Sequence, residues 1–579
     1  MLKLYKQLKP YVGSLIVIGI LLCIQVATSL FLPTLMAEIV DKGIMNGDTS
    51  YILNVGGEML IVTIIGMIAM IISSLFISKV GIGFARDIRS KLFRKVESFS
   101  QGDIDKIGVA SLTTRTTNDI TQVSTVTITI LRMMVTAPIM MVGAIIMAVE
   151  KSPKLSVVIL IAIPILLIVI TLIGMKGVPL YKSIQSRLDK VNQVMREKLN
   201  GIRVIRAFNK SEFESVKFNE ANKELTDTSI KVNKLMGSLQ PVLMLILNIT
   251  TVALVWVGAI MVNNGSVQIG NLMAVIQYAM QIMFSLIMLA MMFVMIPRGA
   301  ASAKRINEVM DIEPSIKDDI KVKNAKIDKG SIEFKDVEFA FEGAETPVLS
   351  NISFKVNAGE TLSIIGGTGS GKSTLVSLIP RLYDITSGEI LINGTSIGSI
   401  SQEELRNHIG YVPQKAILFS GTIEENIRYG KENATDEEVK HAAGVAQASE
   451  FIEKMDGSYK HAIAQGGTNV SGGQKQRLSI ARAIVRKPSV YVFDDSFSAL
   501  DFKTDAKLRA GLKNETKDSA TIIVTQRISS AKDSDRILVL DEGQIVGMGT
   551  HKELAKNCPL YKEIALSQLS KEEMQNEFN

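Results

Sequence analysis

A glycine-rich segment in the second half of the chain has the residue types and spacing of a phosphate-binding loop. An apolar, strand-like run precedes it and a helix-like stretch beginning at Thr374 follows, so the pattern GxxxxGK(S/T) stands in its expected context. Glycines let backbone amides curve around an anion, and the helix N-terminus adds positive potential. We predict that this loop binds the phosphates of ATP, with the lysine on the β and γ phosphates and the serine on Mg²⁺. The loop reads Gly366-Gly367-Thr368-Gly369-Ser370-Gly371-Lys372-Ser373.

Two adjacent carboxylates follow an apolar run further along the chain. Residues 489–493 are mostly hydrophobic, and Asp494 and Asp495 come directly after them. Acidic residues after such a run are also a common strand end. The phosphate loop upstream favours the alternative, in which a strand delivers Asp494 to the Mg²⁺ of the bound nucleotide.

The segment Ser471-Gly472-Gly473-Gln474 stands between these two elements and is followed by KQRLSIARAIVRKPS. Here the sequence resembles the ABC transporter ATPases, and six apolar spans followed by one such domain resemble an ABC half-exporter of the type IV, multidrug-resistance kind. In that family this signature segment opens a helix whose amides bind the γ-phosphate held by the opposite subunit. The resemblance therefore implies that two chains enclose two ATP molecules.

Three further positions match the family one by one. Phe341 falls where the family stacks an aromatic ring, usually Tyr, on adenine, and Phe keeps the π face. Gln414 matches the residue that touches Mg²⁺ and relays to the membrane domain, and Asp501 matches the loop that contacts the other subunit. Taken alone, Phe341 and Gln414 are better interpreted as a core aromatic and a surface amide.

Two residues depart from the family pattern at the site of hydrolysis. Active members carry Glu, which polarises the attacking water, where this chain has Asp495, and a switch His where it has Gln526. The shorter carboxylate is withdrawn by more than about 1 Å, a displacement that can reduce the rate on the order of a hundredfold. Gln can donate a hydrogen bond but carries no charge. This combination resembles the degenerate-site subunit of heterodimeric bacterial multidrug exporters, whose intact signature completes the partner's active site. A further deviation lies just before the signature, where Gln465-Gly466-Gly467 replaces the Glu-Arg-Gly of many exporters.

The elements that must position these residues fall into a membrane half and a soluble half. Long apolar runs alternate with basic links, and the positive-inside rule puts both termini and the two long links in the cytoplasm of a multi-pass protein of the cell membrane. We predict an all-α six-helix transmembrane domain over 1–298, a linker over 299–328, an α/β P-loop nucleotide-binding domain of ABC type over 329–568 and a polar tail over 569–579. The runs lie near residues 12–37, 58–81, 126–149, 155–177, 237–263 and 270–296.

Composition supports this division and excludes other classes. The 579 residues are 47% hydrophobic, too apolar for an ordinary soluble enzyme, and the net charge of +7 fits basic cytoplasmic loops better than nucleic-acid binding. Two cysteines and four scattered histidines provide neither a disulfide framework nor a zinc site.

The sixth span contains seven methionines beside Tyr278 and Phe284, which is typical of an adaptable surface for varied ligands and equally of packing between helices. Gln25, Asn248 and Arg132 are expected to face the bundle interior or its ends. The leading hypothesis is ATP-driven export of hydrophobic or amphipathic compounds by a heterodimer, with hydrolysis mainly at the partner-led site. The alternatives are an ATP-gated regulator or channel subunit, or an exporter of lipids or peptides.

Overall fold

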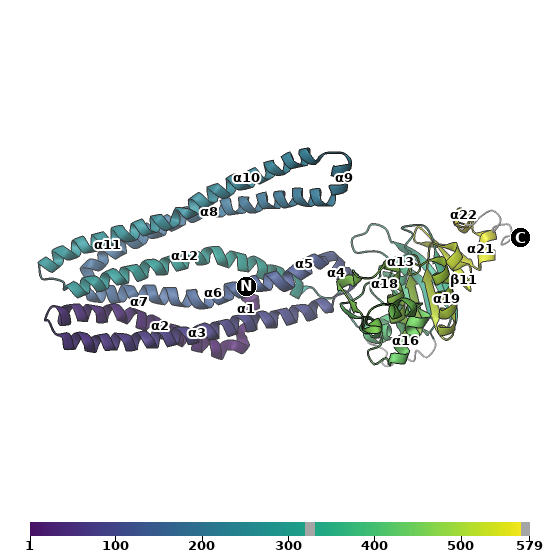
Figure 1. Cartoon of the computed structure of the whole chain (residues 1–579), viewed down its shortest axis with the longest axis horizontal. Helices are drawn as coiled ribbons and strands as arrows, with labels where there is room; N and C mark the ends of the chain where they lie inside the picture. The colour runs from purple at the N-terminus through teal and green to yellow at the C-terminus, as the bar shows by residue number, and fades with distance from the viewer. Residues whose placement is uncertain (319–329, 569–579) are drawn as a thin grey trace. The chain divides into compact units, whose positions relative to one another are not determined.

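The computed structural model describes residues 1–318 and 330–568, and its contacts divide the chain into two compact units (Figure 1). The first, the membrane unit, comprises Met1–Glu97 and Val109–Ile312, and the second, the nucleotide unit, comprises Ser98–Gly108 and Glu313–Asn579. Part of the predicted linker, 319–328, and the predicted tail, 569–579, lie outside the described residues.

The membrane unit is all helical. Six helical stretches among the described residues are long and apolar enough to cross a bilayer, which confirms the predicted six-helix domain. Short 3₁₀ and π-helical segments, η1 (Lys6–Tyr11), η2 (Ile39–Ile44), η3 (Arg115–Asp119) and η4 (Ile130–Met134), continue or interrupt them. The α-helices are α1 (Leu2–Tyr5), α2 (Val12–Glu38), α3 (Thr49–Glu97), α5 (Val109–Thr114), α6 (Ile120–Thr129), α7 (Val135–Lys151), α8 (Pro153–Asn200), α9 (Ile202–Ala207), α10 (Ser211–Gly237), α11 (Leu239–Asn263) and α12 (Ile269–Asp311).

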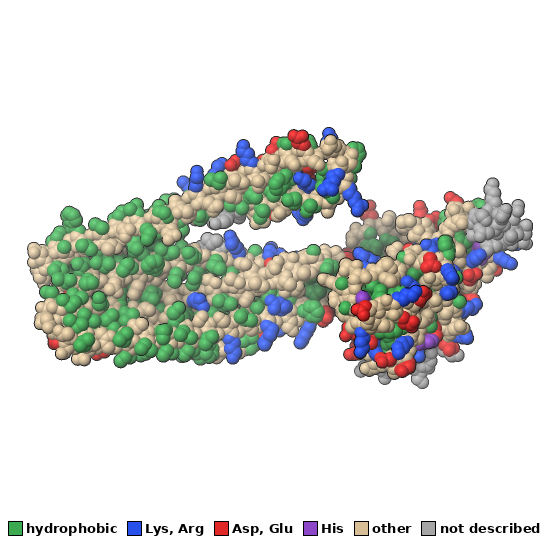
Figure 2. Space-filling model, viewed as in Figure 1, with side chains coloured by type: hydrophobic (Ala, Val, Ile, Leu, Met, Phe, Trp, Pro, Cys, Tyr) green, Lys and Arg blue, Asp and Glu red, His purple; other side chains and the backbone are tan. Residues whose placement is uncertain are grey.

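Hydrophobic side chains cover the outer face of this unit over the spans, and Lys and Arg gather towards one end of it (Figure 2). Such a band is what a lipid-facing surface requires, because lipid offers no hydrogen bonds to polar groups. Inside, Tyr278 is fully buried and its hydroxyl donates to the carbonyl of Leu30 at 2.9 Å. Asn248, on α11, and Arg132 are both exposed in the single chain and Gln25 is half-buried, whereas the sequence predicted that all three face the bundle interior or its ends.

Helix α12 continues beyond the apolar span as far as Asp311, so residues 299–311 of the predicted linker are helical. Ala303, Ile306 and Val309 are completely buried, and their spacing of three residues marks one packed face of a helix. The ion pair of Arg305 with the buried Asp119, at 2.8 Å, holds the same part of α12 to η3.

The nucleotide unit is built on two main sheets. A six-stranded sheet has the order β12-β11-β3-β10-β9-β6, in which only β12 is antiparallel, and a four-stranded antiparallel sheet has the order β2-β1-β4-β5. A short pair, β7 (Gly421–Thr422) and β8 (Ala462–Ile463), forms a third sheet. The remaining strands are β1 (Ile332–Phe339), β2 (Leu349–Val356), β3 (Thr361–Ile365), β4 (Ser387–Ile392), β5 (Thr395–Ser396), β6 (Ile409–Val412), β9 (Val490–Asp494), β10 (Ala520–Val524), β11 (Arg536–Asp541) and β12 (Gln544–Gly549).

Helices surround these sheets, and their hydrophobic faces form the cores of the unit. Strands β9 and β10 are buried at every position, the continuous apolar pattern expected of central parallel strands. The helices are α4 (Gln101–Ile107), α13 (Lys372–Ser377), α14 (Gln402–Asn407), α15 (Ile423–Arg428), α16 (Asp436–Val445), α17 (Ser449–Glu453), α18 (Gly472–Ile484), α19 (Phe502–Glu515), α20 (Ile528–Ala531), α21 (His551–Asn557) and α22 (Pro559–Gln568), with short 3₁₀ turns η5 (Ile397–Ser399), η6 (Ser458–Lys460) and η7 (Gln465–Gly467).

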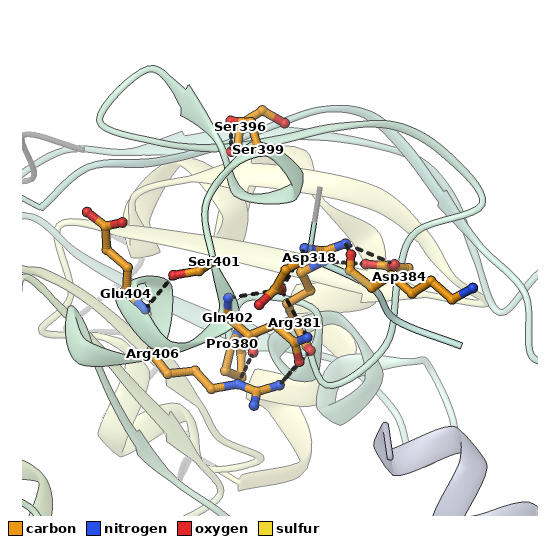
Figure 3. Close-up of polar contacts among 11 residues, drawn as sticks. Asp318, Pro380, Arg381, Asp384, Ser396, Ser399, Ser401, Gln402, Glu404 and Arg406 are labelled. Carbon is orange, nitrogen blue, oxygen red and sulfur yellow. Dashed lines mark hydrogen bonds and ion pairs between the residues drawn. The ribbon is translucent and has the colours of Figure 1, made fainter. Parts of the chain in front are cut away.

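A polar network holds the segment that enters the nucleotide unit (Figure 3). Asp318 accepts hydrogen bonds from the backbone and side-chain amides of Gln402, at 3.2 and 3.1 Å. Arg406 donates to the carbonyl oxygens of Pro380 and Arg381, both at 3.0 Å, and the buried Arg381 pairs with Asp384 at 2.6 Å. The network joins the entering segment to the turn after α13, the helix that follows the phosphate loop.

Candidate nucleotide site

The predicted phosphate loop connects β3 to α13, as its sequence context requires. Gly369 and Gly371 adopt positive φ of 86° and 96°, which other residues rarely accept. Any side chain at Gly366 would lie 2.1 Å from the carbonyl oxygen of Leu540. The Lys372 ammonium, 7% exposed, donates to the carbonyls of Gly366 and Gly367 at 2.9 and 2.5 Å. Burial lowers its pKa, and the two nearby aspartates oppose this shift.

Two predicted Mg²⁺ ligands meet at the carboxyl ends of parallel strands. The hydroxyl of Ser373 donates to Oδ1 of Asp494 at 2.9 Å, and Asp494 is only 4% exposed. Burial raises the pKa of Asp494, and the neighbouring Asp495 adds to the rise, whereas Ser373 and Lys372 oppose it. A cation between these oxygens would remove the cost of a buried negative charge, so the residues fit Mg²⁺.

The two deviant residues lie at the same cavity as the loop. A recess of about 270 Å³ is lined by residues from the phosphate loop, by Gln414, by Asp495 and by Gln526. Gln414 Nε2 donates to Oδ2 of Asp495 at 3.3 Å, and burial raises the pKa of Asp495. Asp495 has a φ of 45°, a left-handed conformation that Asp accepts more readily than Glu does.

The signature segment lies elsewhere in the chain's own fold. Ser471 caps α18 and forms a capping box with Gln474, accepting its backbone N–H at 3.3 Å and donating its own N–H to the Gln474 side chain at 2.9 Å. None of Ser471, Gly472, Gly473 and Gln474 is among the described residues that line the 270 Å³ recess. Just upstream, Gly466 and Gly467 both have positive φ, of 67° and 66°, which accounts for glycine at these positions.

Asp501 also begins a helix. It caps α19 by accepting the backbone N–H of Thr504 at 2.9 Å. Arg527, the residue after Gln526, donates to the carbonyl oxygen of Ser498 at 2.8 Å and thereby ties the loop before Asp501 to the switch position.

Phe341 lies at a different, larger recess of about 560 Å³ in the nucleotide unit. Its ring is 43% exposed and stands edge-on to Tyr383, with ring centroids 5.6 Å apart. Helix α4 forms another wall, where Asp105 accepts a hydrogen bond from the Tyr383 hydroxyl at 2.8 Å and Lys106 pairs with Glu342 at 2.9 Å. Burial, aided by Asp105, raises the pKa of Tyr383 to about 12.

Comparisons with known proteins agree on one family. The description "ABC transporter transmembrane region" matches residues 15–286, and "ABC transporter" matches residues 349–498. An uncharacterized ABC transporter ATP-binding protein of Mycobacterium tuberculosis is 41% identical over 570 residues, which cover 98% of this chain and 97% of the relative. The uncharacterized ABC transporter ATP-binding protein YfiB of Bacillus subtilis is 39% identical over 572 residues, 99% of each chain. The chain belongs to the ABC transporter family.

A solved structure extends this result to the whole architecture. A bacterial Atm1-family ABC exporter with ATP bound shares 25% identity with a TM-score of 0.78, covering 97% of this chain and 98% of its own. This ABC transporter therefore has the predicted exporter fold, is a multi-pass membrane protein, and carries an ATP-binding domain that acts as an ATPase coupled to transport.

Two contacts of the ABC transporter's site were not found from its sequence. Gln568, at the end of α22, donates to the carbonyl of Gln526 at 2.7 Å and accepts the N–H of Ile528 at 2.9 Å, so it clamps the switch position from both sides. The second is the Tyr383–Asp105 hydrogen bond. No local pattern marks Gln568 or Tyr383, because each acts on a residue far away in the sequence.

Proposed function

We propose that this ABC transporter is one half of a heterodimeric exporter that moves hydrophobic or amphipathic compounds across the cell membrane, using ATP hydrolysed mainly at the partner-led site. The observation that carries the proposal is that Asp495 and Gln526 line the same recess as Lys372 and Gln414. Both departures from the active family pattern thus meet at one nucleotide, whereas the residues that hold the phosphates are intact.

Binding and hydrolysis are separable in this site. The loop amides and Lys372 hold the phosphates, and Ser373, Asp494 and Gln414 would hold Mg²⁺. The family resemblance assigns Phe341, at the separate recess beside Tyr383, to adenine. When bound, Mg²⁺ neutralises charge on the β and γ phosphate oxygens. The water-polarising group is Asp495, which is shorter than Glu and whose Oδ2 already accepts a hydrogen bond from Gln414. Gln526 can donate only an uncharged hydrogen bond to the γ-phosphate. We infer that the site retains ATP and turns it over slowly.

Two features support a second subunit. The signature residues lie away from the chain's own phosphate loop, and the capping box uses the amides of Ser471 and Gln474 but not those of Gly472 and Gly473, which can therefore meet a nucleotide held by another chain. Large apolar side chains are exposed in and just after helix α9, which lies between α8 and α10: Val204 in α9 is 60% exposed, Phe208 at its end 73%, and Phe213 in α10 65%. Exposure of this kind marks an interaction surface. We assign it to the nucleotide-binding domain of the partner.

Orientation and cargo follow from charge and side-chain chemistry. The Lys and Arg side chains of the membrane unit gather at the ends of α3, α8 and α10, which the positive-inside rule assigns to the cytoplasm together with the nucleotide unit (Figure 2). In α12 Met283 and Met292 are buried, whereas Met288 and Met291 are exposed. The exposed pair provides a pliable apolar surface for varied cargo.

The division of labour can be tested by comparing ATP hydrolysis by the purified chain with that of the chain co-purified with its partner. We expect little turnover alone and restored turnover in the pair, without any change at Asp495. A partner with Glu and His at the corresponding positions and an altered signature is expected. Robust turnover by the chain alone would overturn the degenerate-site proposal. Nucleotide-dependent conductance without uphill transport into sealed vesicles would favour a channel or regulator instead.

A further inference from the structure

A mostly apolar recess that contains several polar side chains lies among the helices of the membrane unit. It has a volume of about 210 Å³ and is lined from α2, α3, the π-helical segment η4, the first turn of α7, and α12. Met70 and Met288 are among its apolar walls, and its polar lining residues are Gln25, Ser73, Ser74, Arg132 and Thr136. Polar groups that converge inside a membrane domain are costly and mark ligand sites more often than lipid-facing positions.

Arg132 gives this recess its charge. It is the only Asp, Glu, Lys or Arg between Asp119 and Glu150. It precedes Lys151, at the end of α7, by 19 residues, about 28 Å of helix, so it lies towards the end of the span opposite Lys151. Arg132 is exposed in the single chain, and a positive charge within a span is stabilised by a polar or anionic partner.

The partners of Arg132 are incomplete within the chain. Its Nη2 donates to the hydroxyl of Ser74 at 2.9 Å, and among the described residues no carboxylate forms an ion pair with it. A guanidinium has five donors arranged for a carboxylate or phosphate, so one neutral hydroxyl uses a small part of its capacity.

The local backbone also departs from a regular helix at this point. Segment η4, Ile130–Met134, is π-helical, and such insertions occur frequently at functional sites because they re-aim one side chain relative to the rest of the helix. The Thr136 hydroxyl donates a hydrogen bond to the carbonyl oxygen of Arg132 at 2.7 Å, which stabilises this irregular turn.

We propose that the Arg132 recess binds the anionic group, a carboxylate or phosphate, of an amphipathic compound whose apolar body lies against the methionine side chains. This inference rests on the proposed export function and names its cargo class. The volume fits an acidic head group with a short apolar segment, and it falls below the roughly 300 Å³ of ordinary ligand pockets, so a second subunit would enclose the rest of the molecule.

The test uses the complex of the chain with its partner in nanodiscs made only of zwitterionic lipid. Binding of 1-pyrenebutyric acid, its methyl ester and 1-pyrenebutylamine is measured by fluorescence titration, because the three probes share one skeleton and differ in charge. The variants are Arg132→Gln, Arg132→Lys and the matched control Lys151→Gln, which removes one positive charge at the end of α7.

We expect Arg132→Gln to weaken binding of the acid by about tenfold or more, and to change binding of the ester by less than about twofold. Arg132→Lys should retain much of the affinity, and Lys151→Gln all of it. Equal losses for acid and ester would overturn the proposal, since Arg132 would then serve packing alone. Failure of the wild-type complex to bind the acid, while it binds the ester or amine, would also overturn it.

Two further experiments distinguish a lipid head group from a free compound as the source of the anion, and the anion site from the export function. Phosphatidylglycerol added to the nanodiscs should compete with the acid in an Arg132-dependent way if a lipid head group uses the site, and leave its affinity unchanged if the site takes free compounds. ATP-driven uptake of the three probes into inverted vesicles tests export itself. Binding of the acid without uptake of any probe would contradict the export function and support the anion site. Uptake of the ester and amine but not of the acid would support export and contradict the anion site.

Discussion

Restoring the family's residues at positions 495 and 526 should convert this chain into an efficient ATPase. A homodimer would supply an intact signature, from Ser471 to Gln474, to both of its nucleotides, so the slow hydrolysis proposed above would originate at Asp495 and Gln526. The double variant Asp495→Glu with Gln526→His therefore tests the origin of the deficit directly.

The magnitude follows from the geometry of the recess. One added methylene advances the carboxylate by about 1.5 Å, the length of a carbon–carbon bond, and a misplacement of about 1 Å can cost a hundredfold, or about 2.7 kcal/mol of activation free energy. Replacing Gln526 by His exchanges one hydrogen-bond donor for a chargeable one, for which we expect about a further tenfold. Because the two groups act on one γ-phosphate, their effects should not be fully additive, and we expect an increase of about 10² to 10³.

The assay is phosphate release by the purified chain in nanodiscs at saturating Mg²⁺ and ATP, with dimer formation followed by mass photometry. Asp495→Asn is the matched control, because it retains the size of the side chain and removes its basicity. The φ of 45° at residue 495 should make Glu cost about 1 kcal/mol of folding stability, visible as a lower Tm. If the double variant forms ATP-dependent dimers and yet turns over within threefold of the wild type, the assignment of the deficit to these two side chains is wrong.

Three other predictions concern single contacts. Because burial raises the pKa of Asp494, the folded apo protein binds the Asp494 proton more tightly than the unfolded chain does, so folding stability should fall as pH rises from the ordinary aspartate pKa through the raised one. Mg²⁺-dependent ATP binding should strengthen over the same pH range. Asp494→Asn should flatten both pH profiles, measured as Tm and by binding titration. Tyr383→Phe removes the hydrogen bond to Asp105 on α4, and should reduce stimulation of the complex's ATPase by transported compounds several-fold while ATP affinity stays within twofold. Gln568→Ala releases the backbone on both sides of Gln526, and should raise hydrogen exchange at Ile528 severalfold, whereas Ser567→Ala should not.

Much of the fold was predictable because its signals are local. The apolar spans, the glycine loop and the aspartate after a buried strand are each contained within a few tens of residues, and parallel pairing of β10 with β3 and β9 then brings Lys372 and Asp494 to one edge. The sequence even contained the signal for the longer α12, since the buried residues Ala303, Ile306 and Val309 recur at helical spacing, but the surrounding charges obscured it.

The contacts that were not predicted join residues distant in the chain. Tyr383 meets Asp105 across 278 positions, and Gln568 meets Gln526 across 42, and neither spacing corresponds to a helix, strand or turn period. Only the packing of α4 and α22 onto the nucleotide unit creates these pairs. A single sequence therefore predicts candidate ATP-binding groups more readily than the groups that hold them in position.

The predicted phosphate-binding residues and the two residues that depart from the family pattern differ in how deeply they are packed. Among the predicted phosphate-binding groups, Lys372 is buried and donates to the loop carbonyls, and the exposed Ser373 donates to the buried Asp494. The groups that differ from active family members sit at the rim of the same recess, where Asp495 is half-buried and Gln526 is exposed. Changes at the rim alter the chemistry of one nucleotide without disturbing the packed loop that binds it. The proposed slow hydrolysis is thus compatible with an intact fold, and an ATP retained at this site would keep the two nucleotide-binding domains of the proposed heterodimer together while the second site cycles.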